Sequence, residues 1–463
     1  MKRGRGFYRE VVTLATPILL QNLITSMLGM ADTFMVGTLG EVSMAAVTLA
    51  NIPLFAIQVF IFGIQSGSTV LISQYWGHRD TDSMVRVIGT ATWIVLCISG
   101  LAAAIFIICP VQFLSFFNNQ EEVVVLAAKY ARYAALSLIF NGPVMVYITA
   151  YRSMGRPSLG TYILVSSMSV NVVLNWIFIF GHFGAPAMGV EGAAFATLLS
   201  RILELIIMTI HASVTKGFRL KPRLMIFPGW EMFRRFVLYG GPVVLNESLW
   251  GIGSSVFPTI MGHMNGSTEI LAAYAISGNV NDIFMVFSFG LGAAASIIIG
   301  REVGAGRTEE VKPIGLVLDT LAFLTGAGTG CLLFIFAVWV APAVVYPLFK
   351  LSPEAGSIAT MMMVVLSIFR PLRDFNGVNI VGVLRGGGDV KMATCIDILP
   401  LWLVAIPAAF FCGIILRTSI TVVFLMISLE QVVKCILGVT RVRSDGWIRD
   451  LTQASLGGRK GSK

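Results

Sequence analysis

Twelve apolar stretches, each long enough to cross a lipid bilayer as an α-helix, constrain the fold of this chain more than any other feature. Only 12% of the residues are charged, whereas soluble domains carry about 25%. The sequence therefore predicts an all-α integral membrane protein with twelve transmembrane helices. The expected spans are residues 11–36, 46–75, 85–109, 122–150, 158–181, 189–213, 234–261, 270–300, 313–340, 354–383, 392–414 and 418–438.

The net charge of +9 does not indicate a nucleic-acid partner, because most Lys and Arg residues lie in the loops between the apolar stretches. The six Cys residues occur singly and the four His residues lie far apart in the sequence. Neither a disulfide framework nor a zinc site is predicted from such spacing. We expect the lipid bilayer as a partner, no resident cofactor, and a monomer.

Lys and Arg are concentrated in alternate loops, which predicts the orientation of the chain. One set of loops holds most of them, including Arg152 and Arg385, whereas the opposite set holds Lys350 and Arg417. Both termini are therefore expected on the cytoplasmic side of the cell membrane. The basic segment around Trp447 is expected to lie on the inner leaflet.

The two halves of the chain resemble each other in the order and spacing of several residues. Gly63 and Gly77 are matched by Gly290 and Gly304 at a constant offset of 227 residues. Later in each half, Arg152 is matched by Arg385 at an offset of 233 residues. Six spans in each half give two lobes that enter the membrane in the same sense, as in secondary transporters.

The repeat predicts the domain organisation. We expect an N-terminal lobe at residues 1–214, a cytoplasmic linker at 215–231, a C-terminal lobe at 232–440 and a cytoplasmic tail at 441–463. The spans of each lobe are expected to form a pseudo-symmetric six-helix bundle.

Asp32 lies inside the first apolar stretch, where a carboxylate costs about 2.5–3.5 kcal/mol and needs a partner, a proton or an ion. Asn175 and Thr197 lie within about 6 Å of the same depth at 1.5 Å per residue, and Asn171 lies one turn from Asn175. These oxygen atoms suit Na⁺, and a protonated Asp32 would also find partners there. Simple interhelical hydrogen bonds are the alternative.

Four motifs together resemble the multidrug and toxic compound extrusion (MATE) transporters. They are DTFMVGxxG at residues 32–40, NxxxNW at 171–176, GAAxAT at 192–197 and GxLRGGGD at 382–389. The resemblance covers about residues 10–440, and LRGGGD is its most specific part. It implies a two-lobed antiporter that exports small organic cations in exchange for Na⁺ or H⁺. Some members carry a carboxylate where this chain has Asn175, so Asp32 is expected to carry the only negative charge of its site.

The C-terminal lobe has its own carboxylates. Glu247 and Asp282 are expected near mid-membrane on adjacent spans, where only one of the two should be ionised at a time. Asp374 directly follows Arg373 and lies four residues after Arg370, at a spacing from LRGGGD that resembles a coupling position in part of the family. A salt bridge to these arginines is the alternative. Because Glu247 has no basic neighbour in sequence, we expect Glu247 rather than Asp374 to take up a proton.

Aromatic side chains on the same spans are candidates for a substrate cavity, since aromatic faces bind flat organic cations. The candidates are Trp250, Tyr274, Phe284 and Phe287. Packing or contact with lipid is the alternative for each of them.

Secondary antiport of organic cations or drugs is the favoured function. A flippase of lipid-linked saccharides is the alternative within the same superfamily, although such proteins usually have a basic cavity and the buried charges expected here are mainly acidic. An intramembrane enzyme would need a convergent catalytic set, which the sequence does not show. The chain has no Walker A motif, so direct coupling to ATP is not expected.

Overall fold

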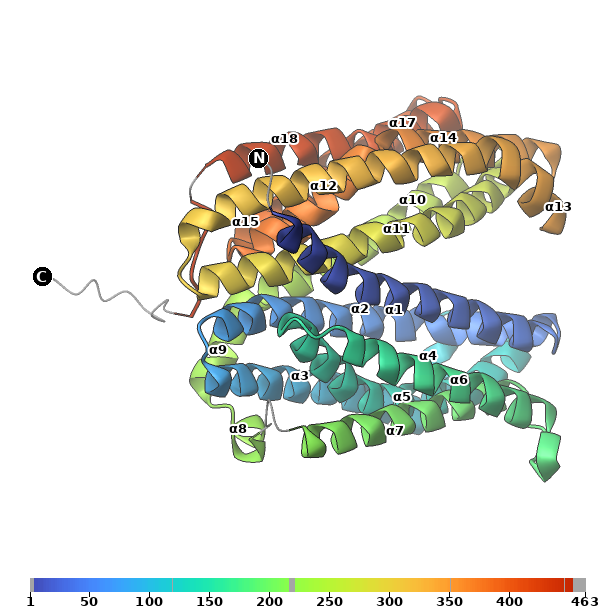
Figure 1. Ribbon diagram of the computed structural model, residues 1–463. Helices are drawn as coiled ribbons and strands as arrows, with labels where there is room; N and C mark the ends of the chain where they lie inside the picture. Colours follow the sequence, from blue (N-terminus) through green and yellow to red (C-terminus); the bar gives the residue numbers. More distant parts are fainter. Residues whose placement is uncertain (1–3, 119, 216–220, 350, 445, 453–463) are drawn as a thin grey trace, which may run out of the picture. The chain divides into compact units, whose positions relative to one another are not determined.

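A computed structural model describes residues 4–118, 120–215, 221–349, 351–444 and 446–452, and these residues are almost entirely helical (Figure 1). The elements of the first half are α1 (Arg5–Gly37), α2 (Glu41–Gly77), α3 (Thr81–Ile108), α4 (Pro110–Leu114), α5 (Glu121–Ser153), α6 (Ser158–Phe180), η1 (His182–Gly184), α7 (Val190–Val214), α8 (Pro222–Ile226) and α9 (Trp230–Tyr239). Those of the second half are α10 (Gly241–Gly262), α11 (Ser267–Gly304), α12 (Thr308–Ile335), η2 (Phe336–Val345), α13 (Tyr346–Leu348), α14 (Pro353–Asn376), η3 (Gly377–Leu384), α15 (Val390–Pro400), η4 (Leu401–Ala405), α16 (Ile406–Phe410), η5 (Phe411–Ile415), α17 (Ile420–Ser428) and α18 (Glu430–Arg443).

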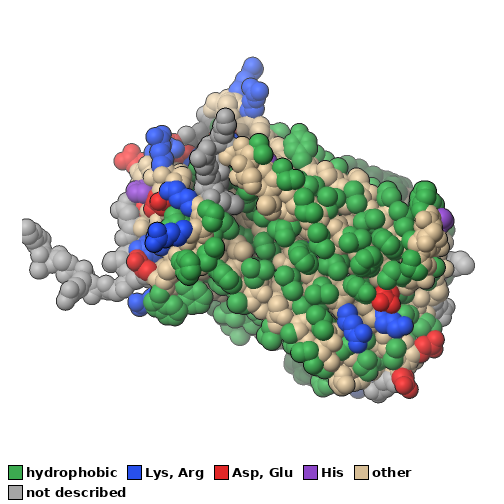
Figure 2. Space-filling view, turned by 90° about the horizontal axis from the view of Figure 1, so that it is seen from below, with side chains coloured by type: hydrophobic (Ala, Val, Ile, Leu, Met, Phe, Trp, Pro, Cys, Tyr) green, Lys and Arg blue, Asp and Glu red, His purple; other side chains and the backbone are tan. Residues whose placement is uncertain are grey.

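The helices confirm the predicted fold class. Ten helical runs among the described residues are long and apolar enough to cross a membrane. Helices α1 and α10, with 33 and 22 residues, occupy the first and seventh expected spans and complete the set of twelve. Hydrophobic side chains cover the middle of the face shown in Figure 2, as expected for a surface in contact with lipid.

Four π-helical segments interrupt the spans of the second half. The segments η2, η4 and η5 lie at or just after Pro342, Pro400 and Pro407, respectively. Proline lacks the N–H group that would continue an α-helical hydrogen-bond ladder, so the turn around it widens. The segment η3 has no proline of its own and leads directly into the LRGGGD motif.

The chain forms two compact units, whose boundaries depart from the expected lobes. The N-terminal unit contains residues 20–76 and 80–244, and the C-terminal unit contains residues 1–19, 77–79 and 245–463, as far as these are described. The beginning of each lobe's first helix therefore belongs to the other lobe's unit. The expected linker is also part of a unit, because α8 packs on α3 and the Trp93 indole N–H donates to the Ile226 carbonyl.

Two glycines of the sequence repeat explain this exchange of segments. Within the N-terminal unit, a Cβ atom at Gly63 would lie 2.8 Å from the Val244 Cα atom at the start of α10. Within the C-terminal unit, a Cβ atom at Gly290 would lie 3.0 Å from the Ala15 carbonyl oxygen in the first half of α1. In both places the second long helix of a lobe needs glycine so that a crossing helix can approach closely.

The tail beyond α18 folds back onto the C-terminal unit. Trp447 is fully buried, its indole N–H donates to the Val442 carbonyl, and a Cβ atom at Gly387 would overlap its ring. The Arg449 N–H donates to the Gly387 carbonyl, and Asp389 of the LRGGGD motif forms an ion pair with Arg449. A glycine-lined seat in the protein therefore encloses the indole ring of Trp447, whose segment was expected to lie on the inner leaflet.

Candidate functional site

The structure brings Asp32, Asn171 and Asn175 together in the N-terminal unit. The Asn175 Nδ2 atom on α6 donates to the Asp32 Oδ1 atom on α1 at 2.6 Å and to the Asn171 Oδ1 atom at 3.2 Å. Both asparagines are buried, and Asp32 is partly buried. The Asn175 Oδ1 atom is buried without a hydrogen-bond partner, so this amide still has an acceptor available for a cation or a donor.

Thr197 is not joined to this cluster by a hydrogen bond. Its hydroxyl group donates to the Ala193 carbonyl one turn back on α7, at 3.0 Å. A hydroxyl oxygen keeps lone pairs when it donates, so the helix-bonded Thr197 retains acceptor capacity. Three of the four expected residues, Asp32, Asn171 and Asn175, are thus joined by hydrogen bonds.

The same unit also contains an ion pair between Arg201 and Glu204 on α7. The guanidinium group of Arg201 forms a 2.6 Å ion pair with Glu204, whose side chain is fully buried, and the Asn141 amide lies 3.5 Å from the other Glu204 oxygen. Arg201 is the basic group whose charge acts on Asp32, but it is held by Glu204 rather than by Asp32. Among the described residues, Asp32 forms no ion pair.

The C-terminal unit contains a line of alternating charges, which we call the charge ladder. It consists of Glu247, Arg385, Asp397, Lys434 and Glu430. Arg385 Nη1 lies 2.7 Å from Glu247 Oε1, and Arg385 Nη2 lies 3.7 Å from Asp397 Oδ2. Lys434 Nζ lies 3.0 Å from Asp397 Oδ1 and 3.6 Å from Glu430 Oε1. The ladder joins α10, the LRGGGD motif, α15 and α18.

Glu247 has no basic neighbour in sequence, as stated above, but the fold brings one to it. Its partner Arg385 lies 138 residues later in the sequence and was expected in a loop, but the Arg385 side chain is only 1% exposed. The expectation that Glu247 takes up a proton loses its main support, because the carboxylate is already stabilised by a guanidinium group.

Asp374 is also paired. The Arg370 Nε atom lies 3.0 Å from the Asp374 Oδ1 atom, both side chains are buried, and the Thr329 hydroxyl donates to Asp374 Oδ2 at 3.3 Å. Arg370 also donates to the Asn281 Oδ1 atom at 3.0 Å. This is the salt bridge given as the alternative for Asp374.

Asp282 does not pair with Glu247 in the structure. The Asp282 side chain is exposed, and the positive charges of Arg373 and Arg370 act on its carboxyl group. Glu247, in contrast, forms an ion pair with Arg385. The expected close pair of carboxylates is thus replaced by two carboxylates that face different arginines.

The aromatic candidates divide into two groups. Trp250 and Phe287 are 38% and 46% exposed, so both present surface for contact with a substrate or with lipid. Phe284 makes an edge-to-face contact with Phe336 at a ring separation of 6.3 Å, and Tyr274 packs against the buried cluster around Met362. The last two contacts are typical of packing.

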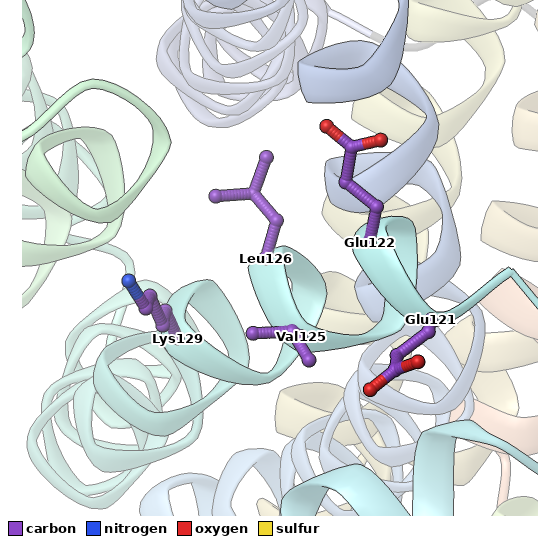
Figure 3. A pocket seen from close by; sticks show the side chains of 5 residues that line it. All are labelled: Glu121, Glu122, Val125, Leu126 and Lys129. Atoms are coloured by element: carbon purple, nitrogen blue, oxygen red, sulfur yellow. The ribbon is translucent and has the colours of Figure 1, made fainter.

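The described residues also form an open depression near the start of α5, which is lined by Glu121, Glu122, Val125, Leu126 and Lys129 (Figure 3). None of the expected site residues lines it. We therefore place the candidate site at the Asp32 cluster and not in this depression.

Comparison with known proteins now identifies the family. The MatE family model matches residues 17–177 and 242–411, which together make up most of the chain. The chain belongs to the MatE family. The match begins again at the start of the second half, as the internal repeat predicts.

Named relatives and solved structures agree with membership of the MatE family. The chain is 26% identical to a probable multidrug resistance protein NorM from Thermotoga maritima, over 87% of this chain and 85% of the relative. It is 25% identical to the probable multidrug resistance protein YoeA from Bacillus subtilis, over 88% of each. An outward-facing multidrug resistance MATE family transporter has the same fold, with a TM-score of 0.83 at 20% identity over 96% of this chain and 98% of that one.

Several charged residues of this MatE family member were not singled out from its sequence, although they lie inside expected spans. Examples are Arg201, Glu204, Asp319, Asp397, Glu430 and Lys434. The rule that drew attention to Asp32, a charge inside an apolar stretch, would have found them. Their partners could not have been found in this way, because Asp397 and Lys434 meet only after α15 and α18 pack together.

Proposed function

We propose that this protein is a secondary active antiporter that exports organic cations or drugs and takes up a proton or Na⁺ in return. Family membership and the multidrug resistance names of the relatives support drug export. The residue that we assign to the exchange is Asp32.

The observation that carries this proposal is the difference between Asp32 and three other carboxylates, those of Glu247, Asp374 and Asp397. Glu247 and Asp374 each contact an arginine, and Asp397 contacts a lysine. Asp32 has only amide hydrogen bonding from Asn175 among its described partners. A membrane carboxylate without a counter-ion is stabilised by whichever cation it can bind, so a proton and an organic cation would compete for Asp32.

The hydrogen bonds around Asp32 support a proton as the coupling ion. The Asn175 amide directs its N–H group towards Asp32 and Asn171, so it acts as a donor to both oxygens. A Na⁺ ion would instead need oxygen ligands around it, and Asn175 would have to turn its Oδ1 atom inwards. A proton on the free oxygen of Asp32 requires no such change.

The charge distribution does not favour the flippase alternative. Arg370, Arg385 and Lys434 are buried, and each contacts a carboxylate. Basic groups that are already neutralised offer little attraction to the diphosphate of a lipid-linked sugar.

The test is transport of ethidium into inside-out vesicles under separately imposed proton and Na⁺ gradients. We expect the wild type to respond to the proton gradient and Asp32→Asn to lose gradient-driven transport while it is still inserted at normal levels. The matched control is Asp82→Asn, because the Asp82 side chain is 52% exposed and pairs with Lys221 at the surface. Full transport by Asp32→Asn would exclude Asp32 as the exchange residue, and a response to Na⁺ alone would exclude the proton.

A further inference from the structure

Asp319 is a buried carboxyl group that the proposed exchange does not use. It lies on α12, eleven residues after the helix begins, and is 4% exposed. Its neighbours Leu318 and Ala322 on the same helix are completely buried in the main apolar core of the C-terminal unit. An ionised carboxylate at such a place costs several kcal/mol unless a positive charge or several donors compensate it.

One amide is the polar partner of Asp319. The Nδ2 atom of Asn379, on the π-helical segment η3, donates to the Asp319 Oδ2 atom at 2.8 Å, and Asn379 is fully buried. A Cβ atom at Gly438 would lie 2.5 Å from the Asn379 Oδ1 atom, so α18 packs closely over this amide. The pair is therefore enclosed by three elements of the same unit.

Two oxygen atoms of this pair have no hydrogen-bond partner. They are Asp319 Oδ1 and Asn379 Oδ1, both of which are buried. Both atoms are acceptors as long as Asp319 is ionised, so neither can satisfy the other. Two buried acceptors without a donor destabilise the folded protein, because each has lost its hydrogen bonds to water.

No basic side chain compensates Asp319 among the groups that the structure describes. On its own helix and on η3, the group that acts on Asp319 is the neutral Asn379 amide. On α18 the facing titratable group is the Cys435 thiol, and the adjacent Lys434 is directed towards Asp397 and Glu430. The charged residues Arg370 and Asp374 on α14 pair with each other, and Glu302 on α11 pairs with Arg307.

We propose that Asp319 and Asn379 form a proton-binding site in the C-terminal unit, separate from Asp32. A proton taken from water onto Asp319 Oδ1 converts that atom into a donor, and the O–H group then donates to Asn379 Oδ1. The amide N–H continues to donate to Asp319 Oδ2, so acid and amide form a cyclic pair with two hydrogen bonds. One proton thereby satisfies both orphan oxygens and removes the buried charge.

Infrared spectroscopy of the purified full-length protein tests this proposal. We expect a carbonyl band of a protonated carboxyl group at neutral pH that shifts in D₂O and disappears in Asp319→Asn. The matched control is Asp374→Asn, which removes a carboxylate of similar burial that is paired with Arg370. The band should remain in this control. A spectrum of Asp319→Asn that still contains the full band would overturn the proposal.

Asn379→Ala provides a second readout that keeps Asp319 in place. Without its amide partner, the protonated carboxyl group loses hydrogen bonds, so its carbonyl band should move to higher frequency. An unchanged band in Asn379→Ala would contradict the cyclic pair.

The pH dependence of thermal unfolding distinguishes a proton from Na⁺. Asp319→Asn resembles the neutral acid in shape, so the wild type should match it at acid pH. As the pH rises and Asp319 ionises, the midpoint of the wild type should fall below that of the variant. A midpoint that Na⁺ raises at alkaline pH in the wild type but not in Asp319→Asn would assign the site to Na⁺ and refute the proton.

Discussion

The two units hold corresponding arginines, the partly buried Arg152 and the buried Arg385, in different ways. In the N-terminal unit, Arg152 Nη2 donates to the Gln21 Oε1 atom on α1. In the C-terminal unit, Arg385 donates to Glu247 on α10 at 2.7 Å. Gln21 follows Pro17 by about one turn, and Glu247 follows Pro242 by about one turn, so the two partners occupy similar positions in the repeat. One arginine is thus neutralised, whereas the other is bound by an uncharged amide.

The side-chain chemistry of the partners explains this difference. Gln21 uses its Oε1 atom for Arg152 and its Nε2 group for two further acceptors, the Pro157 carbonyl at 2.8 Å and the Thr161 hydroxyl at 3.0 Å. A carboxylate cannot donate, so glutamate could not replace all of these contacts. Glu247 meets a guanidinium group, for which a carboxylate is the stronger partner.

The comparison indicates that the two halves of a duplicated fold can use their charged residues for different purposes. The C-terminal unit uses carboxylates mainly to neutralise cations along the charge ladder, which ties its helices together. The N-terminal unit leaves Asp32 without a counter-ion and holds Arg152 by an amide. Three comparisons of variants test this contrast, beginning with the one expected to have the largest effect.

Removal of the arginine should cost far more in the C-terminal unit. Arg385→Met leaves Glu247 and part of Asp397 as buried, uncompensated carboxylates, which should lower the free energy of unfolding by about 3–5 kcal/mol. The matched variant Arg152→Met leaves only the Gln21 oxygen without its donor, at a cost of about 1–2 kcal/mol. Thermal unfolding of the purified variants measures both, and equal losses would mean that the charge of Glu247 contributes nothing.

Introducing a carboxylate into the N-terminal unit should destabilise it. In Gln21→Glu the new carboxylate gains an ion pair with Arg152 but faces the Pro157 carbonyl without a donor. We expect a net loss of about 2 kcal/mol, because an unsatisfied, repulsive contact in a buried place outweighs the attraction. The midpoint of thermal unfolding is the readout, with Gln112→Glu in the exposed α4 segment as the control. If Gln21→Glu unfolds at a higher temperature than the wild type, the hydrogen bonds donated by the Gln21 amide are not what stabilises this contact.

The reverse exchange should have the smallest effect. Glu247→Gln keeps a hydrogen-bond acceptor for Arg385, and Arg385 retains Asp397 as a second carboxylate at 3.7 Å. The change from a charge-assisted to a neutral hydrogen bond should cost about 1 kcal/mol. A loss as large as that of Arg385→Met, measured in the same way, would make Glu247 rather than Asp397 the main support of the arginine.

Much of the fold could be predicted from hydropathy and the repeat. The twelve spans and the position of Asp32 in the first helix follow from the length of the apolar stretches, because the thickness of the bilayer sets that length. Depth along the spans was sufficient to bring Asn175 to Asp32. It was insufficient for Thr197, because depth does not determine which way a hydroxyl group points within its helix.

Partners that are distant in sequence could not be predicted in this way. The salt bridge of Glu247 depends on Arg385, whose position at the end of a span made it resemble a loop residue. The cyclic acid–amide geometry of Asp319 depends on the π-helical turn that carries Asn379, and nothing in the local sequence of η3 predicts this turn. Tertiary packing, and not local pattern, sets these contacts.

The seat of Trp447 has a consequence for biosynthesis. The seat is built from Gly387 and from Gly315 near the beginning of α12, and the indole ring that fills it is synthesised only after all of the described helices. The first half of α1, which is synthesised before the other described helices, packs in the same unit against Gly290. Domains usually fold in order from the N-terminus during synthesis, but the C-terminal unit must wait for segments as distant in sequence as α1 and Trp447. A stalled or truncated chain that lacks Trp447 would thus present an unfilled hydrophobic seat to the quality-control machinery of the membrane.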